Sequence, residues 1–301
     1  MMDLSEYRTK IDEIDRQLVA LFTERMATAA DIAAYKKAHH LPVLDAAREQ
    51  QKLRQIAELA PAALQNETQT LYRLLLALSR SYQSRLLGPV SPLPAEIEKA
   101  ISDTPQLFLT RAAIACQGVE GAYSQLACER LFCTPEISYF PDLNAVFAAV
   151  DKGLCRYAVV PLESSAVYDL MMRYNFRIVR SVRLKPGRCP TSAAGEESSE
   201  SAQGGNSTRF LCISKQLEIY PEADRTSLMM TLPREPGALA DVLSCLSALG
   251  ISLGRLESRA ACTFYFELEA PVSSPQFLQC MEELGKISEG CSYLGSYSEV
   301  V

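Results

Sequence analysis

The chain has 301 residues and a formal net charge of −6; 48% of its residues are hydrophobic and 22% are charged. This length allows two or three domains, and the composition is typical of a globular protein. An acidic chain has no general attraction to nucleic acid or to an anionic membrane surface, so we expect neither as a partner.

The N-terminal stretch is charged and amphipathic, and no apolar run approaches the length of a membrane span. We therefore expect a cytoplasmic protein without a signal peptide. The ten cysteines form no CxxC pair and lie among apolar neighbours, which is typical of reduced thiols in a protein core. His39 and His40 are the only histidines, so we expect no histidine-based triad and no metal site.

Residues 4–37 are predicted to form one long helix. Asp3 and Glu6 are placed as a capping pair, and the stretch contains no proline or glycine. Such a helix is not stable alone, so its apolar stripe must be buried by later helices of the chain or by a second copy of the same helix. The stripe consists of Ile11, Ile14, Leu18, Leu21 and Phe22.

Two further helices complete the predicted first domain. Asp45 starts the second helix, which runs to about residue 58, and Pro61 ends it. The third helix covers about residues 64–87. Residues 1–88 are thus predicted to be an all-α three-helix domain, and the proline-rich residues 89–106 a linker.

Residues 107–221 show strands alternating with helices, which predicts an α/β lobe with a parallel sheet. Residues 186–207 are rich in Ser, Gly, Ala and Glu without periodicity, and we expect a flexible linker there. The predicted strands cover residues 112–116, 157–161, 177–184 and 206–214, with helices after residue 124 and at residues 167–174.

Residues 222–301 are predicted to form a ferredoxin-like α+β domain, because their elements follow the order β-α-β-β-α-β. The strands are expected at residues 227–231, 252–258, 263–269 and 291–297, and the helices at residues 238–249 and 276–284.

The first helix carries cations at informative spacings. Arg25 and Lys36 are eleven residues apart, which places them about 16 Å apart along the axis and on nearly the same face. Two long cationic side chains can close on one small anion from these positions. Arg8 precedes Arg25 by seventeen residues, about 25 Å, and lies on a different face. It reaches such a site only from a second chain with an antiparallel helix.

Polar residues also share faces on the other two helices. Asp45, Arg48 and Glu49 are at positions i, i+3 and i+4, and Ser79 and Gln83 at i and i+4. Taken singly, each has a structural explanation. Asp45 serves as a helix cap, the Arg48 and Glu49 pair as a solvated charged face, and the other two as surface polar residues.

Taken together, these positions resemble the all-helical chorismate mutases. The resemblance covers the whole first domain, and every polar position that this family uses in its site is filled. The pattern consists of Tyr7-Arg8-x-x-Ile11-x-x-Ile14-Asp15, Glu24-Arg25, Lys36, Asp45-x-x-Arg48-Glu49 and Ser79-x-x-x-Gln83.

The resemblance implies the pericyclic conversion of chorismate to prephenate, which requires no cofactor and no covalent intermediate. The substrate is a dianion that must fold into a compact chair. Arg25, Arg48 and the Arg8 of a homodimer's second chain would clamp its carboxylates, since arginine suits bidentate contacts. Ser79 would assist at one carboxylate.

The same resemblance assigns the remaining polar residues. Lys36 and Gln83 would donate to the ether oxygen, where negative charge grows as the bond breaks. Asp45 and Glu49 would hold the substrate hydroxyl and orient the cations.

The middle segment resembles prephenate dehydratase, and Thr208 matches the threonine which that family needs for catalysis. The family's catalytic domain has two lobes that hold prephenate between them; here the second is absent, with residues 186–207 in its place. A cleft with one wall cannot surround a substrate, so we expect a vestigial lobe. The matching pieces are Gly118-x-x-Gly121-Ala122-Tyr123-Ser124, Val160-Pro161-Leu162-Glu163-Ser164-Ser165, Val167-Tyr168-Asp169-Leu170 and Asn206-x-Thr208-Arg209-Phe210.

The last domain resembles the ACT modules that bind amino acids, which implies phenylalanine as an effector. A helix N-terminus led by Gly237 offers free N–H groups to a carboxylate. The alternative is that Gly237 serves only turn geometry and that Glu257 and Arg259 are a surface pair. The resemblance is carried by Pro236-Gly237-Ala238-Leu239 and Leu256-Glu257-Ser258-Arg259.

Three functions follow from these observations. The first is a dimeric chorismate mutase with a truncated dehydratase lobe and an ACT domain. The second is a bifunctional mutase and dehydratase. The third is a non-catalytic phenylalanine-binding regulator that associates with an intact dehydratase, and the complete set of mutase residues favours the first over it.

Overall fold

The computed structural model describes residues 3–87, 92–162, 164–185, 207–235, 237–259 and 261–300, with only the backbone at residues 46 and 165. The chain divides into two compact units. One comprises residues 1–92, 235–249 and 282–287, and the other residues 93–234, 250–281 and 288–301. Within the described ranges, no helix has the length and apolar character needed to cross a membrane.

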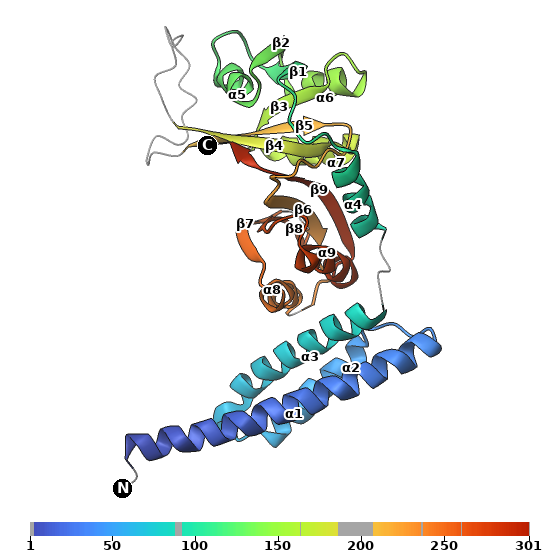
Figure 1. Cartoon of the computed structure of the whole chain (residues 1–301), viewed down its shortest axis with the longest axis vertical. Coiled ribbons are helices and arrows are strands. Elements are labelled where there is room, and N and C mark those ends of the chain that lie inside the picture. Colours follow the sequence, from blue (N-terminus) through green and yellow to red (C-terminus); the bar gives the residue numbers. More distant parts are fainter. Residues whose placement is uncertain are drawn as a thin grey trace. The chain divides into compact units, whose positions relative to one another are not determined.

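The first unit begins with α1 (Leu4–Ala38), which confirms the predicted long helix (Figure 1). The Asp3 side chain accepts from the backbone N–H groups of Ser5 and Glu6, while the Glu6 carboxylate accepts from Asp3 N at 2.9 Å. This reciprocal capping box satisfies donors that the first turn leaves unpaired.

Two more helices and part of the C-terminal segment complete this unit. They are α2 (Ala46–Leu59), a short 3₁₀ turn (Ala62–Leu64) and α3 (Gln65–Leu87), as the proline and capping signals predicted. The α3 helix packs against both α1 and α2, and also contacts α8 (Ala238–Ala248).

The apolar stripe of α1 is not buried by the described part of this chain. Ala29 and Ala33 are the buried residues of α1, whereas Ile11, Leu18 and Leu21 are 56%, 54% and 62% exposed. Later helices therefore do not bury the stripe.

The second unit opens with a helix where the sequence predicted only a linker. The helix α4 (Leu93–Asp103) buries Ile97 and Ala100, and Thr104 after it accepts a hydrogen bond from Ile219 N at 3.0 Å. The prediction of a linker over residues 89–106 is therefore wrong from residue 93 onward. Pro94 was misleading because proline is tolerated in the first turn of a helix.

The predicted α/β lobe forms a six-stranded sheet with strand order β10-β4-β5-β3-β1-β2. The sheet is mixed rather than parallel: β1 runs parallel to β2 and β3, while β5 is antiparallel to β3 and β4. The strands are β1 (Arg111–Gln117), β2 (Thr134–Phe140), β3 (Tyr157–Pro161), β4 (Arg177–Leu184), β5 (Thr208–Ser214) and β10 (Glu299–Val300). The helices are α5 (Tyr123–Leu131), α6 (Leu143–Asp151) and α7 (Ser165–Tyr174).

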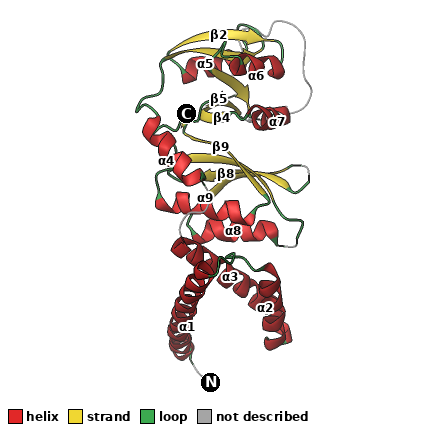
Figure 2. Ribbon diagram, turned by 90° about the vertical axis from the view of Figure 1, so that its right-hand side faces the viewer, coloured by secondary structure: helices red, strands yellow, loops and turns green. Residues whose placement is uncertain are grey.

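A second, four-stranded antiparallel sheet has the order β7-β8-β6-β9. Its strands and the helices α8 and α9 follow one another along the chain as β-α-β-β-α-β, as the sequence predicted. Figure 2 shows its strands β8 and β9. Its strands are β6 (Arg225–Thr231), β7 (Ser252–Ser258), β8 (Thr263–Glu269) and β9 (Gly290–Tyr297). The helix α9 (Pro275–Ile287) lies between β8 and β9 in the chain.

The two sheets of this unit share one hydrophobic core. Phe147 and Phe176 of the lobe belong to the same buried cluster as Tyr265 and Leu294 of the second sheet. Gly295 of β9 lies against β4 so closely that an added Cβ would be 2.8 Å from Ile178 N. The expected boundary near residue 222 is therefore not a physical boundary between independent cores.

Candidate functional site

Arg25 and Ser79 are brought together between α1 and α3. The Arg25 guanidinium donates to the Ser79 hydroxyl and to the Leu75 carbonyl at 3.1 Å. Ser79 is buried, and its hydroxyl also lies 3.8 Å from the sulfur of Met26. Two of the predicted substrate ligands thus hold each other in place on facing helices.

Gln83 lies one turn after Ser79 on the same face of α3. It is 7% exposed, and its Oε1 atom is buried without a hydrogen-bond partner. An unpartnered buried amide oxygen is unfavourable and is uncommon in native structures. The position is therefore suited to a polar ligand rather than to packing alone.

Lys36 is half-buried near the end of α1. Its Nζ atom donates to the Val43 carbonyl at 2.5 Å, so the loop after α1 holds the ammonium group. Arg8 is exposed on the first turns of the same helix, about 25 Å from Arg25 by helical rise. The single chain therefore does not bring Arg8 to Arg25, as the spacing predicted.

The α2 residues have local partners. The Asp45 side chain caps α2 by accepting from Arg48 N at 3.0 Å, which confirms the structural explanation for Asp45. The Arg48 side chain is exposed and donates to Gln51 at 3.0 Å. Glu49 forms an ion pair with Arg80 of α3.

Arg80 was missed by the sequence analysis. It lies between Ser79 and Gln83, but on a face of α3 turned toward α2 and Glu49. The sequence shows only that a charged residue lies inside the Ser79-x-x-x-Gln83 pattern. This does not reveal that Arg80 pairs with Glu49.

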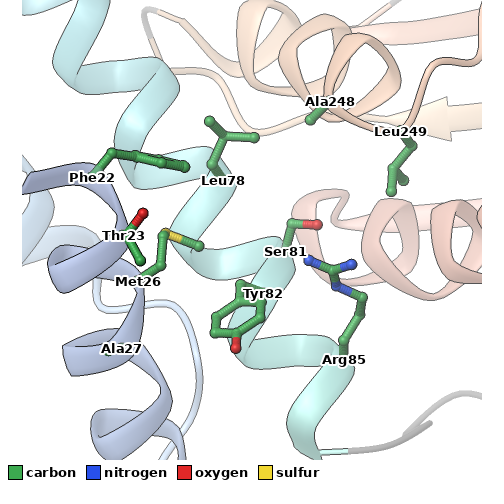
Figure 3. Close-up of a pocket in the computed structure, with 10 residues that line it drawn as sticks. All are labelled: Phe22, Thr23, Met26, Ala27, Leu78, Ser81, Tyr82, Arg85, Ala248 and Leu249. Atoms are coloured by element: carbon green, nitrogen blue, oxygen red, sulfur yellow. The ribbon is translucent and has the colours of Figure 1, made fainter. Parts of the chain in front are cut away.

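Two of the cavities formed by the described residues lie in this unit. One of about 460 Å³ lies between α1 and α3 and is lined in part by Phe22, Met26, Tyr82 and Arg85 (Figure 3). Another of about 690 Å³ is lined in part by residues 40–44 and Arg80. Arg25, Lys36, Ser79 and Gln83 line neither cavity.

The dehydratase-like segments meet at one edge of the six-stranded sheet. Gly118 follows β1, Ser164 follows β3, and Thr208 starts the antiparallel strand β5, whose Phe210 pairs with Pro161. Gly118 adopts a φ of +114°, which a residue with a side chain rarely adopts. Both Gly118 and Thr208 are exposed, so this edge is open to solvent there; Glu163 lies outside the described residues.

Arg209, next to Thr208, belongs to a buried ion cluster instead. It contacts Glu267 of β8 at 2.6 Å and Glu299 of β10 at 2.5 Å, while Tyr297 donates to Glu267 at 3.1 Å. Burial opposes ionisation of Glu267, but the Arg209 guanidinium and these hydrogen bonds outweigh it and hold the pKa of Glu267 below its ordinary value. The cluster thus ties β5 to the second sheet and to β10.

The predicted effector residues have defined local structure. Gly237 precedes α8 with a φ of +100°, so its turn geometry does require glycine, and Ala238 N donates to Glu235 O at 3.3 Å. Leu239 follows in the first turn. On β7, Glu257 accepts from Arg259 at 3.0 Å.

Glu257 and Arg259 form the ion pair that the sequence offered as the alternative to a ligand site, and Arg259 makes one further contact. Ser258 donates weakly to the Arg259 carbonyl at 3.5 Å, and the Arg259 guanidinium lies 4.5 Å from the centre of the Tyr168 ring. This cation–π contact joins β7 to the lobe within the second unit. Pro236 and Ala260 lie outside the described residues.

Comparison with known proteins finds one match in the helical domain and another in the α/β lobe. The family model for type II chorismate mutase matches residues 7–84, and that for prephenate dehydratase matches residues 114–189. The bifunctional chorismate mutase/prephenate dehydratase of Escherichia coli (strain K12) is 24% identical over 377 aligned positions, covering 96% of this chain and 95% of that protein.

Two solved structures share the fold of part of this chain at a TM-score of 0.50. Prephenate dehydratase from Arthrobacter aurescens in complex with L-Phe is 18% identical and covers 62% of this chain and 90% of its own. A protein described as a novel type of quorum quenching acylase, GqqA, is 25% identical and covers 62% of this chain and 94% of its own. One fold therefore carries different named activities.

The fold, the two family matches and the similarity along almost the whole chain agree with one another. Residues 7–84 match the type II chorismate mutase model and residues 114–189 the prephenate dehydratase model, and along almost its whole length the chain is similar to bifunctional chorismate mutase/prephenate dehydratases.

Proposed function

We propose that this protein converts chorismate to prephenate in its helical domain, and that this is its main activity. The observation that carries the proposal is the Arg25 guanidinium held on the Ser79 hydroxyl, one turn from the buried Gln83 amide. Here an arginine fork can bind a carboxylate of the substrate, and Lys36 and the amide nitrogen of Gln83 are the donors for the ether oxygen.

A homodimer completes this site. The exposed stripe of α1 supports it, because a helix face with Ile11, Leu18 and Leu21 more than half exposed is unfavourable in water. Neither cavity of the first unit is lined by the predicted substrate ligands, so a second helix is needed to enclose them. Arg8 of the second chain is the residue we assign to the clamp.

The dehydratase-like lobe is assigned no catalytic role. The alignment to the Escherichia coli relative has 377 positions and this chain 301 residues, so at least 76 aligned positions have no residue here. The exposed positions of Gly118 and Thr208 support a site open to water. Dehydration of prephenate in an enclosed cleft is not expected from such an edge.

Phenylalanine is the effector we assign to residues 237–239 at the start of α8. The support is the glycine-led start of α8, together with the L-Phe complex of the related dehydratase fold. The positive end of the α8 dipole favours a carboxylate, while Ala238 N already donates to Glu235 O.

A bifunctional enzyme is the second candidate, because the matched dehydratase segments converge on one sheet edge. The deciding experiment supplies chorismate to the purified protein and follows chorismate, prephenate and phenylpyruvate separately. We expect prephenate to accumulate. Phenylpyruvate formed faster than in an enzyme-free control would establish the bifunctional alternative, and no loss of chorismate would favour a non-catalytic regulator.

A further inference from the structure

We infer that Arg80 is a positioning residue of the mutase site and that it couples this site to α8. The inference rests on the proposed mutase function, because it acts through Glu49, the residue assigned to the substrate hydroxyl. One guanidinium group on α3 lies between a carboxylate of α2 and a carboxylate of α8.

The first half of this arrangement is the ion pair between Arg80 and Glu49. The two side chains are only 15% and 21% exposed, so solvent and salt screen the pair less than an exposed one. Glu49 has a flexible side chain on the first turn of α2, and without Arg80 it is free to adopt several rotamers. Arg80 therefore fixes the carboxylate before the substrate arrives.

The second half is the contact with α8. The other terminal nitrogen of Arg80 lies 3.7 Å from the Asp241 carboxylate, and Asp241 N donates to Gly237 O at 2.9 Å in the first turn of α8. The neighbouring residue, Ser81, donates to Glu283 of α9 at 2.7 Å. Consecutive α3 residues thus contact both C-terminal helices of the first unit.

This geometry gives α8 a route to the mutase site. A ligand at the Gly237 end of α8 that displaces Asp241 changes how the Arg80 guanidinium is shared between Asp241 and Glu49. The cavity of about 690 Å³ beside Arg80 leaves room for this movement. Coupling of this kind needs two sites and an element that both bias, and Arg80 is that element.

The test of the positioning role is a double-mutant cycle with Arg80→Met, Glu49→Gln and the double variant. We expect Arg80→Met to lower kcat/KM for chorismate roughly tenfold and to have little further effect once Glu49 is replaced. Arg80→Lys should restore part of the loss. The matched control is Arg85→Met, since Arg85 is exposed on the same helix and lies over the Tyr82 ring.

The test of coupling is Asp241→Asn in the full chain, assayed with and without phenylalanine. We expect kcat/KM of the variant without phenylalanine to equal that of wild type at saturating phenylalanine, and the further response to phenylalanine to disappear. A response that survives Asp241→Asn, or a wild type that does not respond, would overturn the coupling.

A third measurement separates this inference from the proposed function. Thermal unfolding of the same four proteins of the cycle reports whether Arg80 and Glu49 interact, whatever the activity. A wild type without mutase activity but with a non-additive unfolding cycle contradicts only the proposed function. Additive effects of the two substitutions on kcat/KM in an active enzyme overturn the positioning role.

Discussion

Arg25 of α1 donates a hydrogen bond to the hydroxyl of Ser79 on α3, so each residue orients the other across the helix interface. Ser79→Ala removes this acceptor and leaves Arg25 with the Leu75 carbonyl. We expect KM for chorismate to rise roughly three- to tenfold with a smaller change in kcat, since the contact serves substrate binding before the reaction. Steady-state kinetics test this, and a purely kcat effect would contradict it.

Lys36→Ala removes a donor to the breaking ether bond. We expect kcat to fall roughly 100-fold or more, because loss of one transition-state donor has effects of this size. The control is Lys37→Ala, which removes an exposed lysine at the next position of α1. Nearly unchanged turnover in Lys36→Ala would remove this residue from the site.

Mixed dimers test whether Arg8 acts across chains. Arg8→Ala and Lys36→Ala are each expected to be nearly inactive, but a dimer of one chain of each kind contains one site with both native residues. Random exchange of equal amounts should restore about a quarter of wild-type activity. No recovery after verified exchange would show that Arg8 serves its own chain or neither.

Thr208→Ala tests the dehydratase-like edge. Thr208 is exposed at the start of β5, and we expect prephenate turnover by the variant to equal that of wild type. The assay follows phenylpyruvate from added prephenate against an enzyme-free control. A clear loss on substitution would show that one lobe is sufficient for dehydration.

The buried Glu267 makes stability depend on pH. Its pKa is held below the ordinary value of 4.5, so the stability it provides is present above that value and is lost as pH falls through the lowered pKa. Unfolding measured between pH 7 and pH 3 should show this loss for wild type. Glu267→Gln should weaken the dependence and, by depriving Arg209 of a charged partner, lower stability at pH 7 by about 3–5 kcal/mol.

A surface pair provides the control for this measurement. Glu136 contacts Arg111, and their side chains are 54% and 73% exposed. Glu136→Gln is expected to change stability by less than about 1 kcal/mol. An equal effect of both substitutions would contradict the importance of burial.

Features encoded by short segments could be predicted from the sequence. The capping box at Asp3, the end of α2 before Pro61 and the β-α-β-β-α-β succession of elements near the C-terminus are of this kind. The helix α4 was missed because Pro94 suggested a linker. The strand β2 and the helix α6 were also missed, since one is seven residues long with a proline at its second position and the other is a short apolar helix.

Features that depend on packing between distant segments could not be predicted. Arg80 finds Glu49 only through the register of α2 on α3, thirty-one positions apart. Gly295 reaches Ile178 only because β9 crosses β4. The pattern provided candidate site residues, but the partners of these residues in the fold, such as Val43 for Lys36, depend on how the loop after α1 folds back.

The pairing of Leu184 with Thr208 at adjoining ends of β4 and β5 has an evolutionary consequence. A segment that leaves and re-enters a sheet at neighbouring positions can change length with little effect on the strands, since each doubling of a flexible loop adds only about 0.6 kcal/mol of closure entropy. A whole lobe could thus be gained or lost between these strands in one genetic step. The same interval is a suitable place to graft a foreign domain.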